Sequence, residues 1–399
     1  MRRTATLLAA LITGAALLPA PAQADSPREW REVFSPDGSI TRMAPPVQPS
    51  SSAGAASVGH TTVTPVQVTG PSSERIDLVF VGDGYTAADL GLYHQHVVSK
   101  WEELAAVEPF RSYRNLFNVW QVNVVSAESG VDNDPAVGVL RDTALDMNFW
   151  CAGIERLLCA NEGKANSYAT RAPAADQVLA LANTTKYGGA GGRIATAAGG
   201  NALAGQIAIH ELGHSLGGLA DEYEYGGPET YGSNEPSEVN VTVDPTGAAK
   251  WSRWLGEQSP DGGVVGAYEG GRYSVRGIYR PTSNSIMRSL GRQFNLPGRE
   301  AMIMAFYQKA PLLKPNAEGA VTGTSTVDLG LPYQLDVRWY LDGTEVAAWA
   351  GRSAVTLNLT GSHKLRAVVT DTTTAVRDEA FRAKHMTAER AWTVSSAGQ

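Results

Sequence analysis

Two histidines and a glutamate lie within one short segment, His210-Glu211-Leu212-Gly213-His214. Residues four apart on an α-helix stand on the same face, so both imidazoles can reach one metal ion while Glu211 lies beside them. Two histidines leave a tetrahedral ion under-coordinated. A catalytic zinc site therefore needs a third protein ligand, with the fourth position left for water. The spacing predicts a zinc site of the hydrolytic kind.

The third ligand is expected just after the helix, where Asp221 and Glu222 follow Gly217-Gly218. A glycine can end a helix in a left-handed conformation and turn the chain back toward the metal. We predict that Asp221 is the ligand and keep Glu222 as the alternative.

The predicted chemistry follows from the ion. Zinc lowers the pKa of its bound water to about 7 and polarises a carbonyl oxygen. A carboxylate that is not a ligand removes the proton of that water and later passes it to the leaving amine. Glu211 is predicted to be this base, and the reaction is hydrolysis of a peptide bond or a related amide. The competing interpretation, an ordinary buried helix that happens to carry these residues, is disfavoured by this context.

Strands and helices alternate before the motif, which favours a mixed α/β fold. A buried strand over residues 75–82 runs into a glycine turn, and Thr86 can cap a helix that begins after it. A second strand covers 117–125, and a helix is expected around 174–182.

The C-terminal part has a different pattern. Apolar and polar residues alternate over 335–341, 355–359 and 363–370, with the turn Asp342-Gly343 after the first of these segments. Trp339 within this set suggests an all-β, immunoglobulin-like sandwich. The segment carries no catalytic constellation, so binding substrate or wall material, or stabilising the enzyme, is its expected use.

The chain is expected to enter the secretory route. Arg2-Arg3, an apolar run and Ala22-Gln23-Ala24 form the pattern of a signal peptide cleaved after Ala24. The run is short for a membrane span, so no membrane anchor is expected, and an uncleaved N-terminal helix is the alternative. The net charge of −7 argues against nucleic acid as a partner.

Composition divides the rest of the chain. The region rich in Pro, Ser, Ala and Gly after the signal buries little, which predicts a flexible leader or short pro-segment. The predicted units are listed here in order: signal peptide 1–24, leader 25–73, catalytic domain 74–317 and β-sandwich domain 318–399. The oligomeric state is left open.

Cys151 and Cys159 are the two cysteines of the chain. In an oxidising compartment they are expected to form a disulfide, and two buried free thiols are the alternative. Eight residues of straight helix would separate them by about 12 Å, so a bridge requires a bend or loop between them.

Further motifs resemble those of the IgA-peptidase family of zinc metallopeptidases, peptidase family M64, and more distantly the metzincins. The matching segments are Gly82-Asp83-Gly84-Tyr85-Thr86, the zinc helix continued through Leu219-Ala220-Asp221-Glu222-Tyr223, Lys250-Trp251, and Tyr279-Arg280-Pro281 leading to Met287. Together they cover roughly residues 75 to 310. The resemblance implies a metzincin-like catalytic domain in which Met287 forms a tight turn under the Zn²⁺ ion.

The chain also departs from the metzincin pattern. The third histidine of that pattern would fall at Ala220, which cannot bind metal, and similarity to aspartate-using secreted metalloproteases assigns the ligand role to Asp221. The tyrosine that often follows the methionine is Ser289 here. Tyr279 and Tyr223 are therefore the candidate oxyanion stabilisers, against the simpler alternative of ordinary packing.

The expected function is that of a secreted, zinc-dependent endopeptidase acting on protein or peptide substrates. Two alternatives stay open. One is a binding or adhesion protein with a remnant zinc site, and the other is an amidase acting on a non-protein amide.

Overall fold

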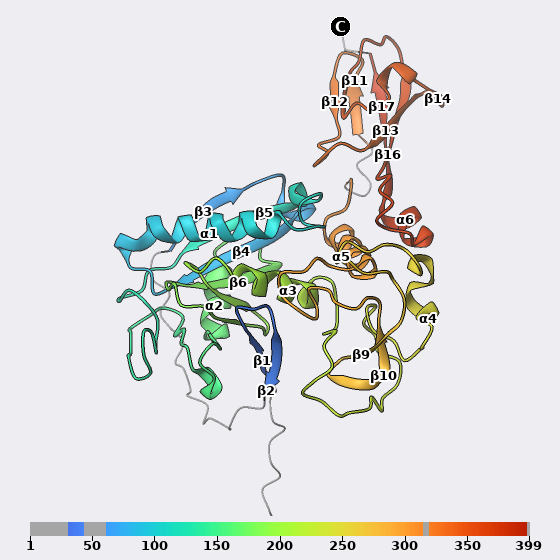
Figure 1. Ribbon diagram of the computed structural model, residues 1–399. Coiled ribbons are helices and arrows are strands. Elements are labelled where there is room, and N and C mark those ends of the chain that lie inside the picture. Colours follow the sequence, from blue (N-terminus) through green and yellow to red (C-terminus); the bar gives the residue numbers. More distant parts are fainter. Residues whose placement is uncertain (1–30, 44–60, 314–318, 397–399) are drawn as a thin grey trace, which may run out of the picture.

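The computed structural model describes residues 31–43, 61–313 and 319–396. The signal peptide and parts of the predicted leader, residues 25–30 and 44–60, lie outside the described residues. The described chain is a mixture of helices and several sheets, which confirms the expected mixed α/β class. A central sheet with its helices forms the main body, and the C-terminal strands form a separate sheet beside it (Figure 1).

The central sheet has six strands, four of them parallel to one another, with an antiparallel strand at each edge. In spatial order they are β3 (Thr62–Gln67), β5 (Phe117–Asn123), β4 (Ile76–Asp83), β6 (Gln177–Ala182), β8 (Ala195–Ala198) and β7 (Gly189–Ala190).

Helices cover both faces of this sheet. On one face, Leu78 and Phe80 of β4 share a core with α1 (Leu90–Ala105) and α3 (Gly205–Ser215). On the other face, Val79 and Val81 pack with α2 (Glu162–Ala169). Parallel strands buried on both sides read as continuous apolar runs, which is why β4 was visible in the sequence. The zinc-motif helix α3 thus lies directly on the sheet.

The prediction of a helix around 174–182 is wrong, because this segment contains strand β6. Its apolar run is short and follows Asp176, and both faces of β6 are buried in the sheet. A short buried strand and a short buried helix have the same hydrophobic pattern, so periodicity could not separate them.

The cap predicted at Thr86 is present, and the helix expected to begin at Ala87 starts with a 3-10 turn over Ala87–Asp89. The carboxylate of Asp89 accepts hydrogen bonds from the backbone N–H and the hydroxyl of Thr86, and α1 follows at Leu90. This arrangement satisfies polar groups at the entry to the helix.

Smaller elements surround the sheet. They are the hairpin strands β1 (Arg31–Phe34) and β2 (Ile40–Met43), the pair β9 (Tyr268–Gly271) and β10 (Ser274–Arg280), and helices α4 (Ala248–Trp251) and α5 (Leu296–Lys309). Single turns of 3-10 helix lie at Ser72–Glu74, Ala87–Asp89, Arg114–Leu116, Cys151–Gly153, Ser252–Trp254 and Ala347–Trp349.

The region expected to be a flexible leader contains ordered structure. Strands β1 and β2 form a hairpin, and β3 is an edge strand of the central sheet. Val33, Phe34 and Ile40 are buried, although the surrounding composition is polar and rich in proline. A segment this short carries too few apolar residues to change the average composition, so the hairpin was missed.

The C-terminal part contains a five-stranded and a two-stranded sheet. The larger sheet has the order β11 (Gly319–Thr322), β17 (Thr387–Ser395), β16 (His363–Thr370), β13 (Asp336–Leu341) and β14 (Thr344–Glu345), and the smaller pairs β12 (Thr326–Asp328) with β15 (Ala354–Thr356). Trp339 is buried in an apolar cluster with residues of both sheets. The C-terminal part departs from the expected all-β class in one respect, since helix α6 (Glu379–His385) lies before β17 and beside α5 (Figure 1).

Cys151 and Cys159 form a disulfide, as predicted, with their Cα atoms 6.0 Å apart. The required bend is present. Trp150 and Ala152 have positive φ angles at the first cysteine, so the chain does not continue as a helix there.

Asp83 connects the end of β4 to the loop that follows β5. Its buried carboxylate accepts hydrogen bonds from the backbone N–H groups of Leu145 and Met147 and from the hydroxyls of Thr143 and Ser126. Each carboxylate oxygen takes one backbone and one hydroxyl donor, so the site requires two acceptor oxygens.

We therefore predict that Asp83→Asn lowers the free energy of unfolding by about 2 kcal/mol, because the amide nitrogen must face a buried backbone donor. Urea unfolding followed by circular dichroism measures this change. Asp142→Asn is the control, since Asp142 is exposed on the same loop. Equal unfolding midpoints for the two variants would contradict the anchoring role of Asp83.

Candidate metal centre

Helix α3 ends in the turn that the sequence predicted. Gly218 has a φ of +59°, and the backbone N–H of Leu219 donates to the carbonyl of Gly213 over 3.1 Å. This left-handed ending reverses the chain and returns Asp221 to the side of the helix that carries the two histidines. The two consecutive glycines are therefore part of the construction of the site.

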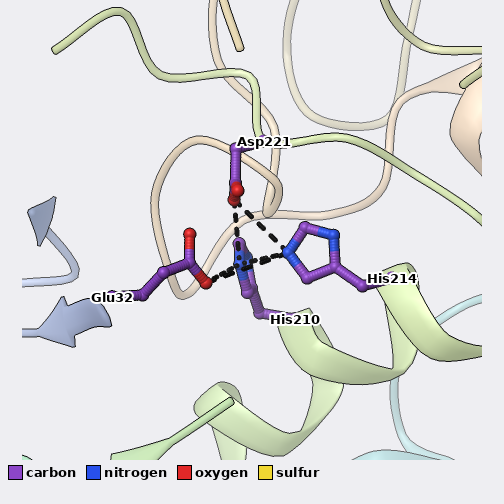
Figure 2. Close-up of side chains that lie close together, drawn as sticks. All are labelled: Glu32, His210, His214 and Asp221. Atoms are coloured by element: carbon purple, nitrogen blue, oxygen red, sulfur yellow. Dashed lines mark hydrogen bonds and ion pairs between the residues drawn. The ribbon is translucent and has the colours of Figure 1, made fainter. Parts of the chain in front are cut away.

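Four side chains converge beside α3. One ligand atom from each of Glu32, His210, His214 and Asp221 lies within 4.8 Å of the other three. The two histidine Nε2 atoms are 3.1 Å apart, and the Oδ1 atom of Asp221 is 3.3 Å from each of them. Figure 2 shows the histidines on successive turns of α3, Asp221 from the returning chain and Glu32 from strand β1.

The other ring nitrogen of each histidine fixes its protonation. Nδ1 of His210 lies 2.9 Å from the carbonyl oxygen of Ile286, and Nδ1 of His214 lies 2.6 Å from that of Leu219. A carbonyl only accepts, so each Nδ1 carries the proton and donates it. In the neutral imidazole, Nε2 then holds a lone pair. The two lone pairs and the Asp221 oxygen face one another.

The surrounding charge favours a cation at this position. Burial lowers the pKa of His214, but the Asp221 carboxylate outweighs it and raises that pKa to about 9. Burial likewise lowers the pKa of His210, while Asp221 and Glu32 together raise it well above its ordinary value. The same negative field that would hold a proton here would hold a divalent metal ion.

Two buried oxygens in this region have no hydrogen-bond partner among the described residues, Oδ1 of Asp221 and Oε1 of Glu211. Unpaired buried carboxylate oxygens are costly unless a cation compensates them. Two imidazole nitrogens and a carboxylate oxygen are donors that zinc accepts in catalytic sites, so the residues fit the predicted ion.

Glu211 lies beside the four-residue group without belonging to it. Its carboxylate presses against the backbone of Gly191, where an added β-carbon would come within 2.2 Å of Oε2. Burial and the charge of Glu32 raise the pKa of Glu211 to about 7, while the two histidines act in the opposite direction. The carboxylate is thus near the ion position but free to exchange a proton.

Glu222, the alternative ligand, lies outside this group. Its buried carboxylate accepts hydrogen bonds from the side-chain amides of Asn240 and Asn295 and from the hydroxyl of Ser285. These contacts tie the returning chain to the segment before Met287 and to the start of α5. The geometry thus supports Asp221 as the ligand and a structural role for Glu222.

Met287 packs against the motif helix at Gly213. It is buried, and an added β-carbon on Gly213 would lie 2.6 Å from its Sδ atom. Its carbonyl accepts from the backbone N–H of Glu222, and the preceding carbonyl accepts from His210. Met287 is a packing residue between the helix and the returning chain.

Three tyrosines differ in their relation to the group. The hydroxyl of Tyr223 donates to a carboxylate oxygen of Glu32, and the hydroxyl of Tyr273 donates to Oδ2 of Asp221 over 2.5 Å. The described contacts of Tyr279 are backbone hydrogen bonds with Thr242. Of the two tyrosines proposed from the sequence, Tyr223 is thus the one that contacts the group.

Sequence reasoning missed Glu32, Tyr273 and Gly191. Glu32 and Tyr273 lie far along the chain from the zinc motif, and the glycine-rich run around Gly191 does not indicate which side chain it would contact. The local signs of this hairpin were the apolar pair Val33-Phe34 after Glu32 and the turn residues Pro36-Asp37-Gly38 that follow it.

The family model described as IgA Peptidase M64 matches residues 64–263 and 259–306, more than half of the 399 residues. The chain belongs to the IgA peptidase M64 family. The resemblance drawn from the motifs is thereby confirmed, and the M64 match makes this chain a peptidase of a metallopeptidase family. Glu32 lies before the matched residues. Comparison with curated proteins finds no match.

No helix among the described residues of this M64 peptidase is both long and apolar enough to cross a bilayer.

The geometry predicts different metal affinities for two neighbouring amide substitutions. Asp221→Asn should weaken zinc binding by more than about a hundredfold, since even residues outside the first ligand set alter metal affinity 10- to 100-fold. Glu222→Gln should bind zinc like the parent chain, because the amide keeps both asparagine donors on one oxygen and can donate to Ser285. Titration against a chromophoric chelator measures both affinities. The opposite order would make Glu222 the ligand.

Proposed function

We propose that this M64 peptidase is a secreted, zinc-dependent endopeptidase with His210, His214 and Asp221 as zinc ligands and Glu211 as general base. The observation that carries the proposal is the convergence of two histidine Nε2 atoms and an unpaired Asp221 oxygen, all within 3.3 Å of one another. The disulfide between Cys151 and Cys159 supports an oxidising, extracellular location.

Zinc bound there would polarise the carbonyl of the substrate and lower the pKa of its bound water to about 7. Glu211 removes one proton from the attacking water as the water oxygen forms a bond to the carbonyl carbon of the substrate. It then gives that proton to the amide nitrogen as the carbon–nitrogen bond breaks. Because Glu211 is packed against Gly191 rather than bound within the ligand group, its carboxylate is available for both transfers.

A metzincin-like domain is the arrangement we propose around this centre. The buried Met287 beneath Gly213 supports it, together with the helix ending at Gly218. A remnant site on a binding protein would have no need for a complete ligand set, a base beside it and a turn that joins them.

Substitution of the base tests the mechanism. Glu211→Gln keeps the size of the side chain and leaves the ligands intact, so zinc content should persist while the rate of peptide hydrolysis falls at least about a hundredfold. Zinc is measured by mass spectrometry of the purified protein, and hydrolysis with a quenched fluorescent peptide library. A zinc-loaded variant that cleaves at the parent rate would exclude Glu211 from the reaction.

Tyr223 is the proposed donor to the oxyanion. Its hydroxyl already donates to a carboxylate oxygen within the ligand group, so it can reach an oxygen that develops negative charge beside the metal.

We expect Tyr223→Phe to lower kcat about 100- to 1000-fold, the usual cost of losing one such donor, with zinc content unchanged. Tyr279→Phe serves as the control and should retain the parent kcat, because the described contacts of Tyr279 come from its backbone. Steady-state kinetics on one purified substrate peptide from the library separates kcat from KM. A loss of activity in the Tyr279 variant alone would reverse the assignment.

A further inference from the structure

The N-terminal hairpin of residues 31–43 packs directly onto the metal centre. Phe34 and Ile40 share an apolar cluster with Ile207 of α3, Tyr223 and Leu290. The ring of Phe34 stands edge-on to that of His210, with the ring centres 5.4 Å apart. The hairpin is therefore part of the wall of the site, although it precedes the part of the chain that matches the family model.

Polar contacts hold the hairpin from both sides. The guanidinium of Arg156 donates to the carbonyl of Phe34 over 2.9 Å, and the hydroxyl of Tyr187 donates to the carbonyl of Ser35 over 3.2 Å. From the other side, the backbone N–H of Leu290 donates to the carbonyl of Gly38 over 2.9 Å. Figure 1 shows the hairpin between the chain around α2 and the chain around β9 and β10.

This docking directs the Glu32 side chain at the histidines. Its Oε2 atom lies 3.6 Å from Nε2 of His210 and 4.0 Å from Nε2 of His214, while Tyr223 donates to its other oxygen. The side chain is only 16% exposed, so Glu32 is not a solvated surface charge. A carboxylate that is mostly shielded from water in this position favours a positive partner, and a metal ion held by the other three residues would supply one.

The hairpin also packs beside the segment that contacts the base. Strand β1 lies against β7, the edge strand of the central sheet, and Val33 packs on Ala190 at its end. The next residue, Gly191, is the one that contacts Glu211. The hairpin is thus adjacent to the segment that contacts Glu211.

We propose that Glu32 is a fourth ligand of the metal and that the hairpin keeps this peptidase latent. The inference rests on the proposed zinc site. A tetrahedral ion bound by two histidines and two carboxylates has no position left for water, which the hydrolytic reaction requires. Full activity therefore requires that the hairpin leaves the site. Signal-peptide cleavage after Ala24, as expected from the sequence, would leave the hairpin in place.

The test uses the full chain with cobalt(II) in place of zinc, because the visible spectrum of cobalt reports its ligands. Glu32→Ala should change this spectrum, bind the small metal ligand acetohydroxamate at least tenfold more tightly, and cleave the peptide library at least tenfold faster. Adding Glu211→Gln to this variant should abolish the gained activity while the altered spectrum remains. Asp37→Ala is the matched control, since Asp37 lies in the turn of the same hairpin and bonds only to Ser39 in the described contacts.

A metal-loaded Glu32→Ala chain with the parent spectrum and the parent acetohydroxamate affinity would overturn the proposal, and so would an Asp37→Ala chain that shows the same changes. If Glu32→Ala does not fold, Glu32→Gln is tested instead. Its amide oxygen can still accept from Tyr223, so only the anionic ligand is lost. The cobalt spectrum of the Glu32→Gln chain must then differ from that of the parent chain. A parent chain that binds no metal would instead refute the proposed function itself, and the latency proposal with it.

Discussion

The site depends on holding together atoms that repel one another. Two imidazole lone pairs and a carboxylate oxygen lie within 3.3 Å, and the carboxylates of Glu32 and Glu211 add further negative charge nearby. Without a cation these groups would separate in water, so the surrounding structure must supply the constraint. The constraint is local and has three parts: the helix, the backbone carbonyls behind it and the returning chain.

Each part fixes one degree of freedom. The helical spacing sets the separation of His210 and His214, and the carbonyls of Ile286 and Leu219 fix which ring nitrogen faces the ion. Glu222 then fastens the returning chain through Asn240, Asn295 and Ser285. This division explains why two adjacent acids have different roles. Asp221 faces the two histidines, while Glu222 faces the amides that determine where Asp221 stands.

The sequence was informative wherever the chemistry is local. Spacing of four residues identified the histidines, and two glycines predicted the reversal that brings Asp221 back, with Gly218 in the left-handed region as expected. Strand β4 and the start of α1 were visible from a continuous apolar run and a cap. Strand β6 was mistaken for a helix because six residues buried on both faces carry no period.

What the sequence could not reveal is contact between distant segments. Glu32 reaches the histidines only because Val33, Phe34 and Ile40 are buried against parts of the chain from Leu157 to Leu290. Three apolar residues in a proline-rich region do not indicate which surface they cover. The same limit applies to Tyr273 and Gly191, whose roles arise from the approach of their segments to Asp221 and Glu211.

The C-terminal sheet has a physical connection to this centre. The buried carboxylate of Glu300 in α5 accepts from the backbone N–H groups of Arg377 and Asp378, and Tyr307 of the same helix donates to Asp371. Further along α5, Met302 packs beneath the glycine turn, where an added β-carbon on Gly217 would lie 2.4 Å from its Sδ atom.

Helix α5 thus joins the C-terminal part to the turn that returns Asp221. A strand domain that served only to capture substrate would need no buried carboxylate at its attachment, because exposed linkers join such modules at lower cost. Burying Glu300 requires that its partners remain in place, since an unpaired carboxylate would destabilise α5. The attachment therefore favours the stabilising role among those expected for the C-terminal part: by fixing α5, it fixes the turn on which the position of Asp221 depends.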